Sequence, residues 1–279
     1  MTLSPLPVPS MLKDYGLQPK KGLGQNFLVD DTYLQRIVEA AGVTSADEVL
    51  EIGAGLGSLT RYLADAAGQV CAVEIDSRFT PVLKKVLKEF PNVNLVNADI
   101  MDTDVGQWMH QPGYLVVANI PYYITSALIR HLLEAEVKPG RIALTIQKEV
   151  AQRVCAKPGD LSLLALSVQV FGAPRVAFNI AAGAFYPAPK VDSALLLVDL
   201  YERPLIANEN MKTFFGLAKS AFAKKRKMLH NALSSHAGLG GEGAGLLLEA
   251  AGISSDRRAQ TLSLEEWGSL TEAYLKLPK

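Results

Sequence analysis

The sequence predicts an α/β protein in which a mostly parallel, seven-stranded sheet with a terminal antiparallel strand is followed by a small all-α C-terminal domain. Three observations support this fold class. Short apolar runs alternate with helical patterns through the first half of the chain, as in β-α-β units. A glycine-rich turn follows the first of these runs. After Arg203-Pro204 only helical periodicity continues.

The strands of the sheet are expected wherever an apolar run is bounded by turn residues. Before them, residues 1–18 are expected to form a flexible tail, because their start is rich in proline and lacks periodicity. Asp30 or Asp31 can then cap a helix that ends at Gly42. The expected strands are residues 49–52, 70–75, 93–97, 115–118, 142–146, 175–180 and 191–200. The last two have no helix between them, so they are expected to be antiparallel.

Helices are expected between the strands and throughout the C-terminal part. Those between strands cover residues 58–67, 77–90 and 125–135, and those after the sheet cover residues 211–233, 245–251 and 263–276. Ser263 and Glu266 have the spacing of a capping box. We therefore expect a domain over residues 19–202 that carries the chemistry and a helical domain over residues 203–279.

Composition limits the class of protein. Hydrophobic residues make up 49% and charged residues 20% of the chain, as in ordinary globular proteins. The net charge of +0 argues against general binding of polyanions, so any nucleic-acid surface is expected to be local. No apolar run is long enough to span a membrane and no signal peptide is recognisable, which predicts a cytoplasmic protein without membrane contact.

Cysteine and histidine usage gives no sign of a metal site. Cys71 and Cys155 are the only cysteines, and they form no C-x-x-C pair. Cys71 lies in an apolar strand pattern, so buried thiols are expected rather than a disulfide. The four histidines lack zinc-ligand spacing, and we expect no metal.

The turn at residues 53–57 has the features of a nucleotide-type binding loop. Gly53 and Gly55 permit a tight turn and close approach of the backbone to a ligand. Ser58 stands where the dinucleotide fingerprint needs glycine or alanine, which argues against a dehydrogenase. Glu74 and Asp99 end the next two strands, so they are expected at the same sheet edge, as acceptors for ribose hydroxyls and an adenine amine. Alternatively, these acids only cap the following helices.

A second turn, Asn119-Ile120-Pro121-Tyr122, follows the fourth strand. The Asn119 amide oxygen and the Ile120 carbonyl can accept both N6 hydrogens of an adenine, Pro121 can hold the turn, and Tyr122 can stack on the base. Phe185 is expected to form the opposite wall. This set favours methyl transfer to adenine N6 on an unpaired or flipped base. The alternative is an ordinary turn with a packed tyrosine.

With these motifs in order, the chain resembles the ribosomal RNA adenine N6,N6-dimethyltransferases from residue 20 to about residue 270. The resemblance rests on residues 21–28, 50–60, 119–123 and 185–194. It implies a Rossmann-like methyltransferase domain that uses S-adenosyl-L-methionine. The implied cofactor contacts are Asn26, Leu28, Gly53, Glu74, Asp99 and Asn119. The implied substrate is a pair of adjacent adenosines in the 3′-terminal hairpin loop of 16S rRNA within the immature small ribosomal subunit, and a monomer is expected.

A basic cluster is the candidate RNA surface. Residues 212–230 contain lysines and arginines but no acid, centred on Lys224, Lys225, Arg226 and Lys227. Such a cluster can neutralise phosphates without reading sequence, and Lys21 is a further candidate. The alternative is a solvated helix face.

Two other functions remain open from the sequence. Related antibiotic-resistance enzymes dimethylate an adenosine of 23S rRNA, and a relative could also be a non-catalytic ribosome assembly factor. The intact turn at Asn119 and the acidic residues Glu74 and Asp99 favour a working enzyme.

Overall fold

The structure, a computed structural model, describes residues 3–224, 226–236 and 238–277. The chain divides into two compact units. The first consists of Met1–Ala151 and Pro174–Leu200, and the second of Gln152–Ala173 and Tyr201–Lys279.

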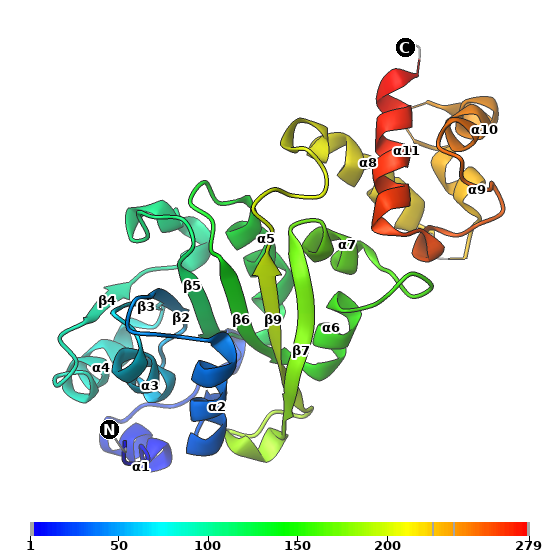
Figure 1. The fold of residues 1–279 in the computed structure, drawn as a ribbon. Helices are drawn as coiled ribbons and strands as arrows, with labels where there is room; N and C mark the ends of the chain where they lie inside the picture. Colours follow the sequence, from blue (N-terminus) through cyan, green and yellow to red (C-terminus); the bar gives the residue numbers. More distant parts are fainter. Residues whose placement is uncertain (1–2, 225, 237, 278–279) are drawn as a thin grey trace. The chain divides into compact units, whose positions relative to one another are not determined.

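A seven-stranded sheet forms the centre of the first unit, in the order β4-β3-β2-β5-β6-β9-β7 (Figure 1). The first five strands in this order run parallel, and β9 pairs antiparallel with β6. The predicted fold class is therefore confirmed. The strands are β2 (Glu48–Ile52), β3 (Gln69–Glu74), β4 (Val93–Asn97), β5 (Leu115–Asn119), β6 (Arg141–Gln147), β7 (Gly172–Ile180) and β9 (Ser193–Leu200).

Helices cover both faces of this sheet because its central strands are apolar on both sides. Val49, Leu50, Val116 and Val117 are buried whichever way their side chains point. Helices α2 and α3 contact each other on one face, while α5 lies behind the strands in the view of Figure 1. The helices are α1 (Val8–Asp14), α2 (Asp31–Ala41), α3 (Ser58–Ala66), α4 (Thr80–Val86) and α5 (Thr125–Glu134), and α6 (Lys148–Val154) leads into the second unit.

The ends of α2 show how local sequence sets an element. Asp30 accepts hydrogen bonds from the backbone nitrogens of Thr32 and Tyr33, which satisfies two amides of the first turn. Gly42 ends the helix in the left-handed conformation. The end at Gly42 was predicted, and the structure decides between the two candidate caps, Asp30 and Asp31, in favour of Asp30.

Two features near the N-terminus differ from the expectation. Residues 8–14 of the expected flexible tail form α1, whose Val8 and Leu12 are buried, and Arg61 donates to the backbone oxygen of Ser4. In addition, β1 (Phe27–Leu28) and β8 (Phe185–Tyr186) form a small antiparallel sheet. Both depend on contacts between distant parts of the sequence, which periodicity does not report.

The second unit is helical. Its helices are α7 (Leu163–Gln169), α8 (Met211–Phe222), α9 (Leu229–Leu233), α10 (Gly240–Ala250) and α11 (Leu264–Lys276). The fully buried Trp267 packs against Phe214 and Phe222 at its core. The predicted capping box of Ser263 and Glu266 is present. Residues 152–173, which we expected with the sheet domain, belong to this unit, where the backbone nitrogen of Gly159 donates to the Gln260 oxygen over 2.8 Å.

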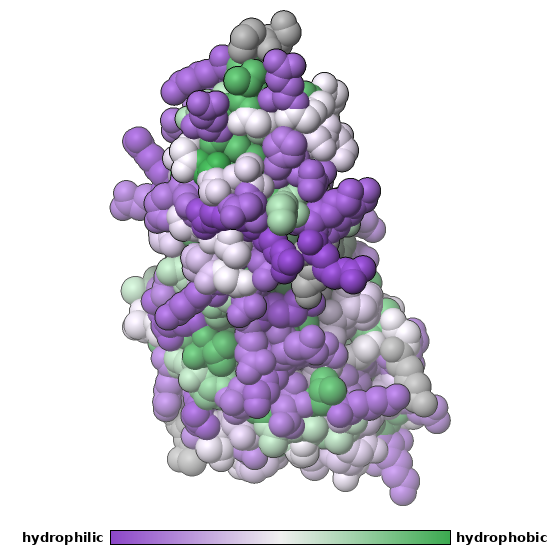
Figure 2. Space-filling model, turned by 90° about the vertical axis from the view of Figure 1, so that its right-hand side faces the viewer, coloured by the Kyte–Doolittle hydropathy of each residue, from purple (hydrophilic) through white to green (hydrophobic). Residues whose placement is uncertain are grey.

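The surface carries no extended apolar region on the face drawn in Figure 2, where small hydrophobic patches lie among hydrophilic side chains. Within the described part of the chain, no helix has the length and apolar character needed to cross a bilayer. Over the same residues, no group of three or more histidine, cysteine or acidic side chains could hold a metal ion.

Candidate active site

A cavity of about 210 Å³ lies at the carboxyl ends of β2, β3, β4 and β5. This is where parallel α/β sheets bind their ligands. Most of the predicted site residues line it, among them Asn26, Gly53, Gly55, Glu74, Asp99, Asn119, Ile120, Pro121 and Tyr122. The sheet edge therefore joins the two motifs that the sequence places far apart.

The glycine turn forms one wall of this cavity. Gly53 and Gly55 have φ angles of +81° and +58°, which side-chain-bearing residues rarely adopt. A Cβ atom on Gly55 would also lie 3.1 Å from the ring of Phe27. The turn thus needs glycine both for its conformation and for its contact with Phe27.

Glu74 holds this turn in place. Its Oε2 accepts a hydrogen bond from the Gly55 nitrogen over 2.7 Å, and its Oε1 accepts one from the Asp76 nitrogen over 2.8 Å. Burial raises the pKa of the Glu74 carboxyl. A carboxylate has about four acceptor positions, so Glu74 keeps capacity for bonds from ribose hydroxyls, the role predicted for it.

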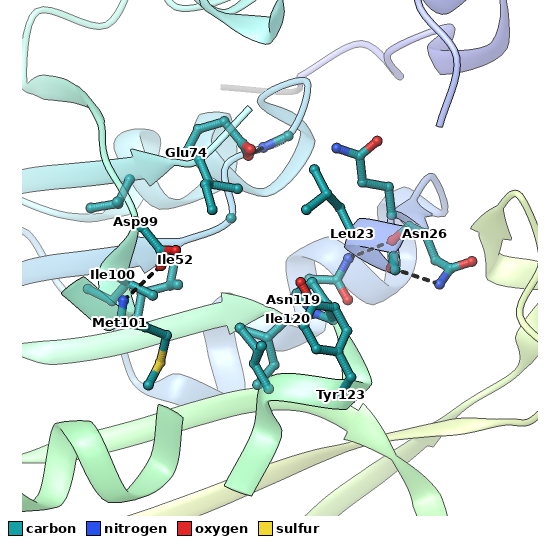
Figure 3. A pocket seen from close by; sticks show the side chains of 18 of the residues that line it. Leu23, Asn26, Ile52, Glu74, Asp99, Ile100, Met101, Asn119, Ile120 and Tyr123 are labelled. Atoms are coloured by element: carbon teal, nitrogen blue, oxygen red, sulfur yellow. Dashed lines mark hydrogen bonds between the residues drawn. The ribbon is translucent and has the colours of Figure 1, made fainter. Parts of the chain in front are cut away.

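Asp99 lies farther along the same edge. Its Oδ1 accepts a hydrogen bond from the Met101 nitrogen over 2.9 Å, which leaves Oδ2 as an acceptor for an amine. Ile75, Ile100 and Met101 line the cavity around it. Figure 3 shows Asp99 and Glu74 on one side of the cavity. An acid set among apolar side chains suits the edge and faces of an adenine ring.

Residues 20–26, here called the strap, close the cavity from the N-terminal side; Leu23, Gly24, Gln25 and Asn26 line it. Asp76 fastens the strap to the end of β3, because its buried carboxylate accepts from Gln25 Nε2 over 3.1 Å and lies 3.7 Å from Lys20 Nζ. Arg78 donates to the same carboxylate from Nε and Nη2, over 2.9 and 2.6 Å. These contacts keep the pKa of Asp76 well below its ordinary value.

The Asn119 turn faces the strap. Asn119 is the last residue of β5, and its Nδ2 donates to the Asn26 backbone oxygen over 3.0 Å (Figure 3). With the amide nitrogen occupied, the Oδ1 atom remains as a hydrogen-bond acceptor. Ile120 is buried, and Pro121 leads into the 3-10 helix η5 (Tyr122–Ile124). The Tyr122 hydroxyl bonds to Ser193 Oγ over 2.7 Å, and burial raises its pKa.

Two predicted residues lie behind the cavity. Phe185 is buried in β8 opposite Leu28 of β1, and neither is among the residues that line the main cavity. Leu28 instead lines a smaller cavity of about 30 Å³ beneath the glycine turn, together with Glu51 and Asn119. At this position Phe185 and Leu28 pair β8 with β1, the strand that follows the strap.

The structure describes only some of the residues that are predicted to bind RNA. Lys224, Arg226 and Lys227 are exposed between α8 and α9, where a turn with a bond from Lys227 N to Lys224 O interrupts the single helix that we expected. Lys225 lies outside the described residues. For Lys21 the backbone is described, in a short 3-10 helix, but not the side chain.

Several residues of the site were not predicted: Gln25, Asp76, Arg78 and Tyr123 around the main cavity, and Glu51 beneath it. Glu51 is fully buried and burial raises its pKa to about 8. Glu51 could have been recognised from the sequence, because it is a carboxylate inside an otherwise apolar strand. The other four residues could not, because their place in the site depends on how the strap folds over the cavity.

Comparison with known sequences identifies a family whose members match this chain over all of these motifs. The sequence profile described as ribosomal RNA adenine dimethylase matches residues 16–276. The chain belongs to the ribosomal RNA adenine dimethylase family. It is 42% identical over 269 residues to the ribosomal RNA small subunit methyltransferase A of Dehalococcoides mccartyi, which covers 96% of this chain and 92% of the relative.

Known structures of two related enzymes share the fold. A dimethyladenosine transferase from Plasmodium falciparum superposes with a TM-score of 0.78 at 27% identity, over 90% of this chain and 98% of the other. The 23S rRNA methyltransferase ErmE superposes with a TM-score of 0.71 at 29% identity, over 89% and 99%. The fold is therefore shared with a dimethyladenosine transferase and with a 23S rRNA methyltransferase.

The cofactor of this dimethylase is S-adenosyl-L-methionine, and the cavity suits it. Glu74 and Asp99 place carboxylates at the cavity wall, while Ile75, Ile100 and Met101 provide apolar surface. The glycine turn gives backbone access without a side chain. Carboxylates at the cavity wall are compatible with a positively charged sulfonium, whereas they would repel a pyrophosphate.

Proposed function

We propose that this protein dimethylates N6 of two adjacent adenosines in the 3′-terminal hairpin loop of 16S rRNA. The observation that carries the proposal is the position of Asn119. Its side chain lies in the same cavity as Glu74 and Asp99, and its amide nitrogen is held by Asn26, so the amide oxygen is left to accept from an adenine amino group.

The amide oxygen has a definite chemical task. The N6 lone pair of adenine is delocalised into the ring, which makes N6 a poor nucleophile. Accepting hydrogen bonds from N6, at Asn119 Oδ1 and at the Ile120 carbonyl, favours the pyramidal geometry in which the lone pair can attack. S-adenosyl-L-methionine supplies the methyl group from its sulfonium. Orientation of this kind can lower a barrier by about 7–11 kcal/mol.

The remaining residues of the turn hold the base and the backbone. Pro121 has φ of −58°, a value fixed by its ring, and starts η5. Tyr122 is anchored through its hydroxyl to Ser193, so its ring can present a fixed face to the base. The strap lines the cavity on the opposite side. No nucleophilic side chain is needed for this chemistry.

The choice of small-subunit rRNA is supported by the identity to a small subunit methyltransferase A over nearly the full chain. Similarity to ErmE in fold keeps 23S rRNA as the alternative substrate. A non-catalytic assembly factor is not favoured, because the acids and the amide of the site are all present.

We further propose how the chain works in the cell. The helical unit, residues 152–173 and 201–279, binds RNA through Lys224, Lys225, Arg226 and Lys227, together with Lys21 of the strap, while the unit that contains the sheet carries the transfer. The protein is proposed to act as a cytoplasmic monomer on immature small ribosomal subunits, without a metal.

One assay tests the proposal. The protein is incubated with radiolabelled S-adenosyl-L-methionine and either small subunits that lack the modification or naked 23S rRNA, and the modified bases are mapped. We expect dimethyladenosine at the two adjacent loop positions of 16S rRNA, and strongly reduced label with the Asn119→Ala variant. Label confined to 23S rRNA would favour the alternative enzyme, and binding without label would favour an assembly factor.

A further inference from the structure

Two consecutive tyrosines of η5 have opposite environments. Tyr122 is partly buried and its hydroxyl is tied to the fully buried Ser193. Tyr123 is 64% exposed, the most exposed large hydrophobic side chain in the described part of the chain. Both line the main cavity. A single turn thus presents one fixed and one solvent-facing aromatic ring at the same opening.

The backbone beneath Tyr123 is well supported. A Cβ atom on Gly24 of the strap would lie 3.0 Å from Pro121 Cβ and 3.5 Å from Tyr123 Cδ1. The strap therefore packs directly against this part of the turn. Figure 3 shows Tyr123 beside Asn119 and Ile120. The ring is held at its base by the strap, although most of its surface remains in water.

An exposed aromatic ring at the opening of a base-binding cavity suits a second base. A nucleotide whose base enters the cavity brings its covalently joined neighbour to the opening. That neighbour has lost stacking on one side, and aromatic side chains recover such stacking in single-stranded RNA. Tyrosine does so at a low cost in side-chain entropy, because only two torsions are fixed.

We propose that Tyr123 stacks on the base next to the adenine that occupies the cavity. This inference rests on the proposed function, and it assigns to the second tyrosine a role in substrate binding that the chemistry at N6 does not require. Tyr122 and Tyr123 then hold two consecutive nucleotides. The loss of Tyr123 weakens RNA binding and leaves cofactor binding intact.

The test compares two RNAs. One is a synthetic hairpin of the 16S rRNA 3′ end, and the other is the same hairpin with an abasic nucleotide beside the target adenosine. Affinity is measured by fluorescence anisotropy for the wild type, Tyr123→Ala and Tyr123→Phe. Tyr123→Ala is expected to bind the intact hairpin about 5- to 150-fold more weakly, the range found for one stacked base, and Tyr123→Phe to bind it normally. On the abasic hairpin all three are expected to bind equally.

Further measurements separate this inference from the proposed function. Tyr15→Ala serves as the control, because Tyr15 is exposed but does not line the cavity. Affinity for S-adenosyl-L-methionine, measured by calorimetry, should be unchanged in Tyr123→Ala. The stacking role would be overturned if Tyr123→Ala lost the same affinity for both hairpins or lost none for the intact one. It would also be overturned if the wild type bound both hairpins equally well. A wild type that fails to methylate small subunits would instead overturn the proposed function.

Discussion

The side-chain nitrogen of Asn119 donates to the backbone oxygen of Asn26 over 3.0 Å, although the two residues are 93 positions apart in the chain. This bond joins the turn that we propose holds the target base to the strap that lines the cavity. Because one N–H of the amide donates to the strap, the bond fixes the orientation of the amide and with it the position of the Oδ1 acceptor.

Substitutions at Asn119 test the roles of its amide nitrogen and its amide oxygen. Asn119→Ala removes both the donor and the acceptor, while Asn119→Asp keeps an acceptor but sets a carboxylate against the Asn26 oxygen. We expect both variants to lose about 10²- to 10³-fold in single-turnover methylation, as when one positioned hydrogen-bonding group is removed from an active site. Thermal unfolding should show that both remain folded. Activity of Asn119→Ala within tenfold of the wild type would contradict the assigned role.

Replacement of Glu74 by glutamine tests its hold on the glycine turn. The carboxylate accepts from two backbone nitrogens, of Gly55 and Asp76, but a glutamine side chain has only one acceptor atom. One buried amide is left unpaired, at a cost of about 1–3 kcal/mol. We expect weaker binding of S-adenosyl-L-methionine by calorimetry. Glu48→Gln, at the exposed start of β2, is the matched control and should bind normally.

The pH dependence of stability tests Glu51. Burial raises the pKa of this carboxyl from 4.5 to about 8 in the folded protein, and its Oε2 has no hydrogen-bond partner among the described residues. Between pH 4.5 and about pH 8, Glu51 is therefore protonated in the folded state and ionised in the unfolded state. Stability from this group is complete below pH 4.5 and is lost as the pH rises toward about 8.

Glu51→Gln removes this titration while it keeps the size of the side chain. Urea unfolding of both proteins at several pH values from 5 to 9 measures the effect. The free energy of unfolding of the wild type should fall relative to the variant as the pH rises, and the difference should level off above about pH 8. Parallel curves would mean that Glu51 is ionised in the folded protein throughout this range.

Much of the fold and part of the site follow from local sequence. The strands that end at Glu74 and Asn119 were predicted because their apolar runs are continuous, and parallel pairing then brings their ends to one edge. The acceptor roles of Glu74 and Asp99 remain predictions. Gln25 and Asp76 could not be paired from sequence, since they are 51 positions apart and no periodicity links them. For the same reason the burial of Phe185 opposite Leu28 was not predicted.

Loss of the Asp76 carboxylate should loosen the strap. Asp76→Ala removes the acceptor of Gln25 and Arg78. We expect the free energy of unfolding to fall by about 1–3 kcal/mol, because Arg78 remains partly hydrated. Hydrogen exchange at residues 20–26 should accelerate, and cofactor affinity should fall. Glu89→Ala, an exposed acid beyond α4, should leave all three unchanged; an unaltered exchange rate in Asp76→Ala would show that Asp76 does not hold the strap.

The basic turn after α8 should act on RNA through charge. Lys224, Arg226 and Lys227 are exposed, so each can neutralise a phosphate and release a counterion. Replacing Lys224 and Lys227 with glutamate should weaken binding of the 16S rRNA hairpin while cofactor affinity stays unchanged. The slope of log affinity against log salt should become shallower by about 0.7 per lost contact, the value for single strands. Lys84 and Lys85, exposed on α4, provide the matched double substitution. If both double variants lower affinity and slope equally, the effect reflects net charge, and the turn has no specific place in RNA binding.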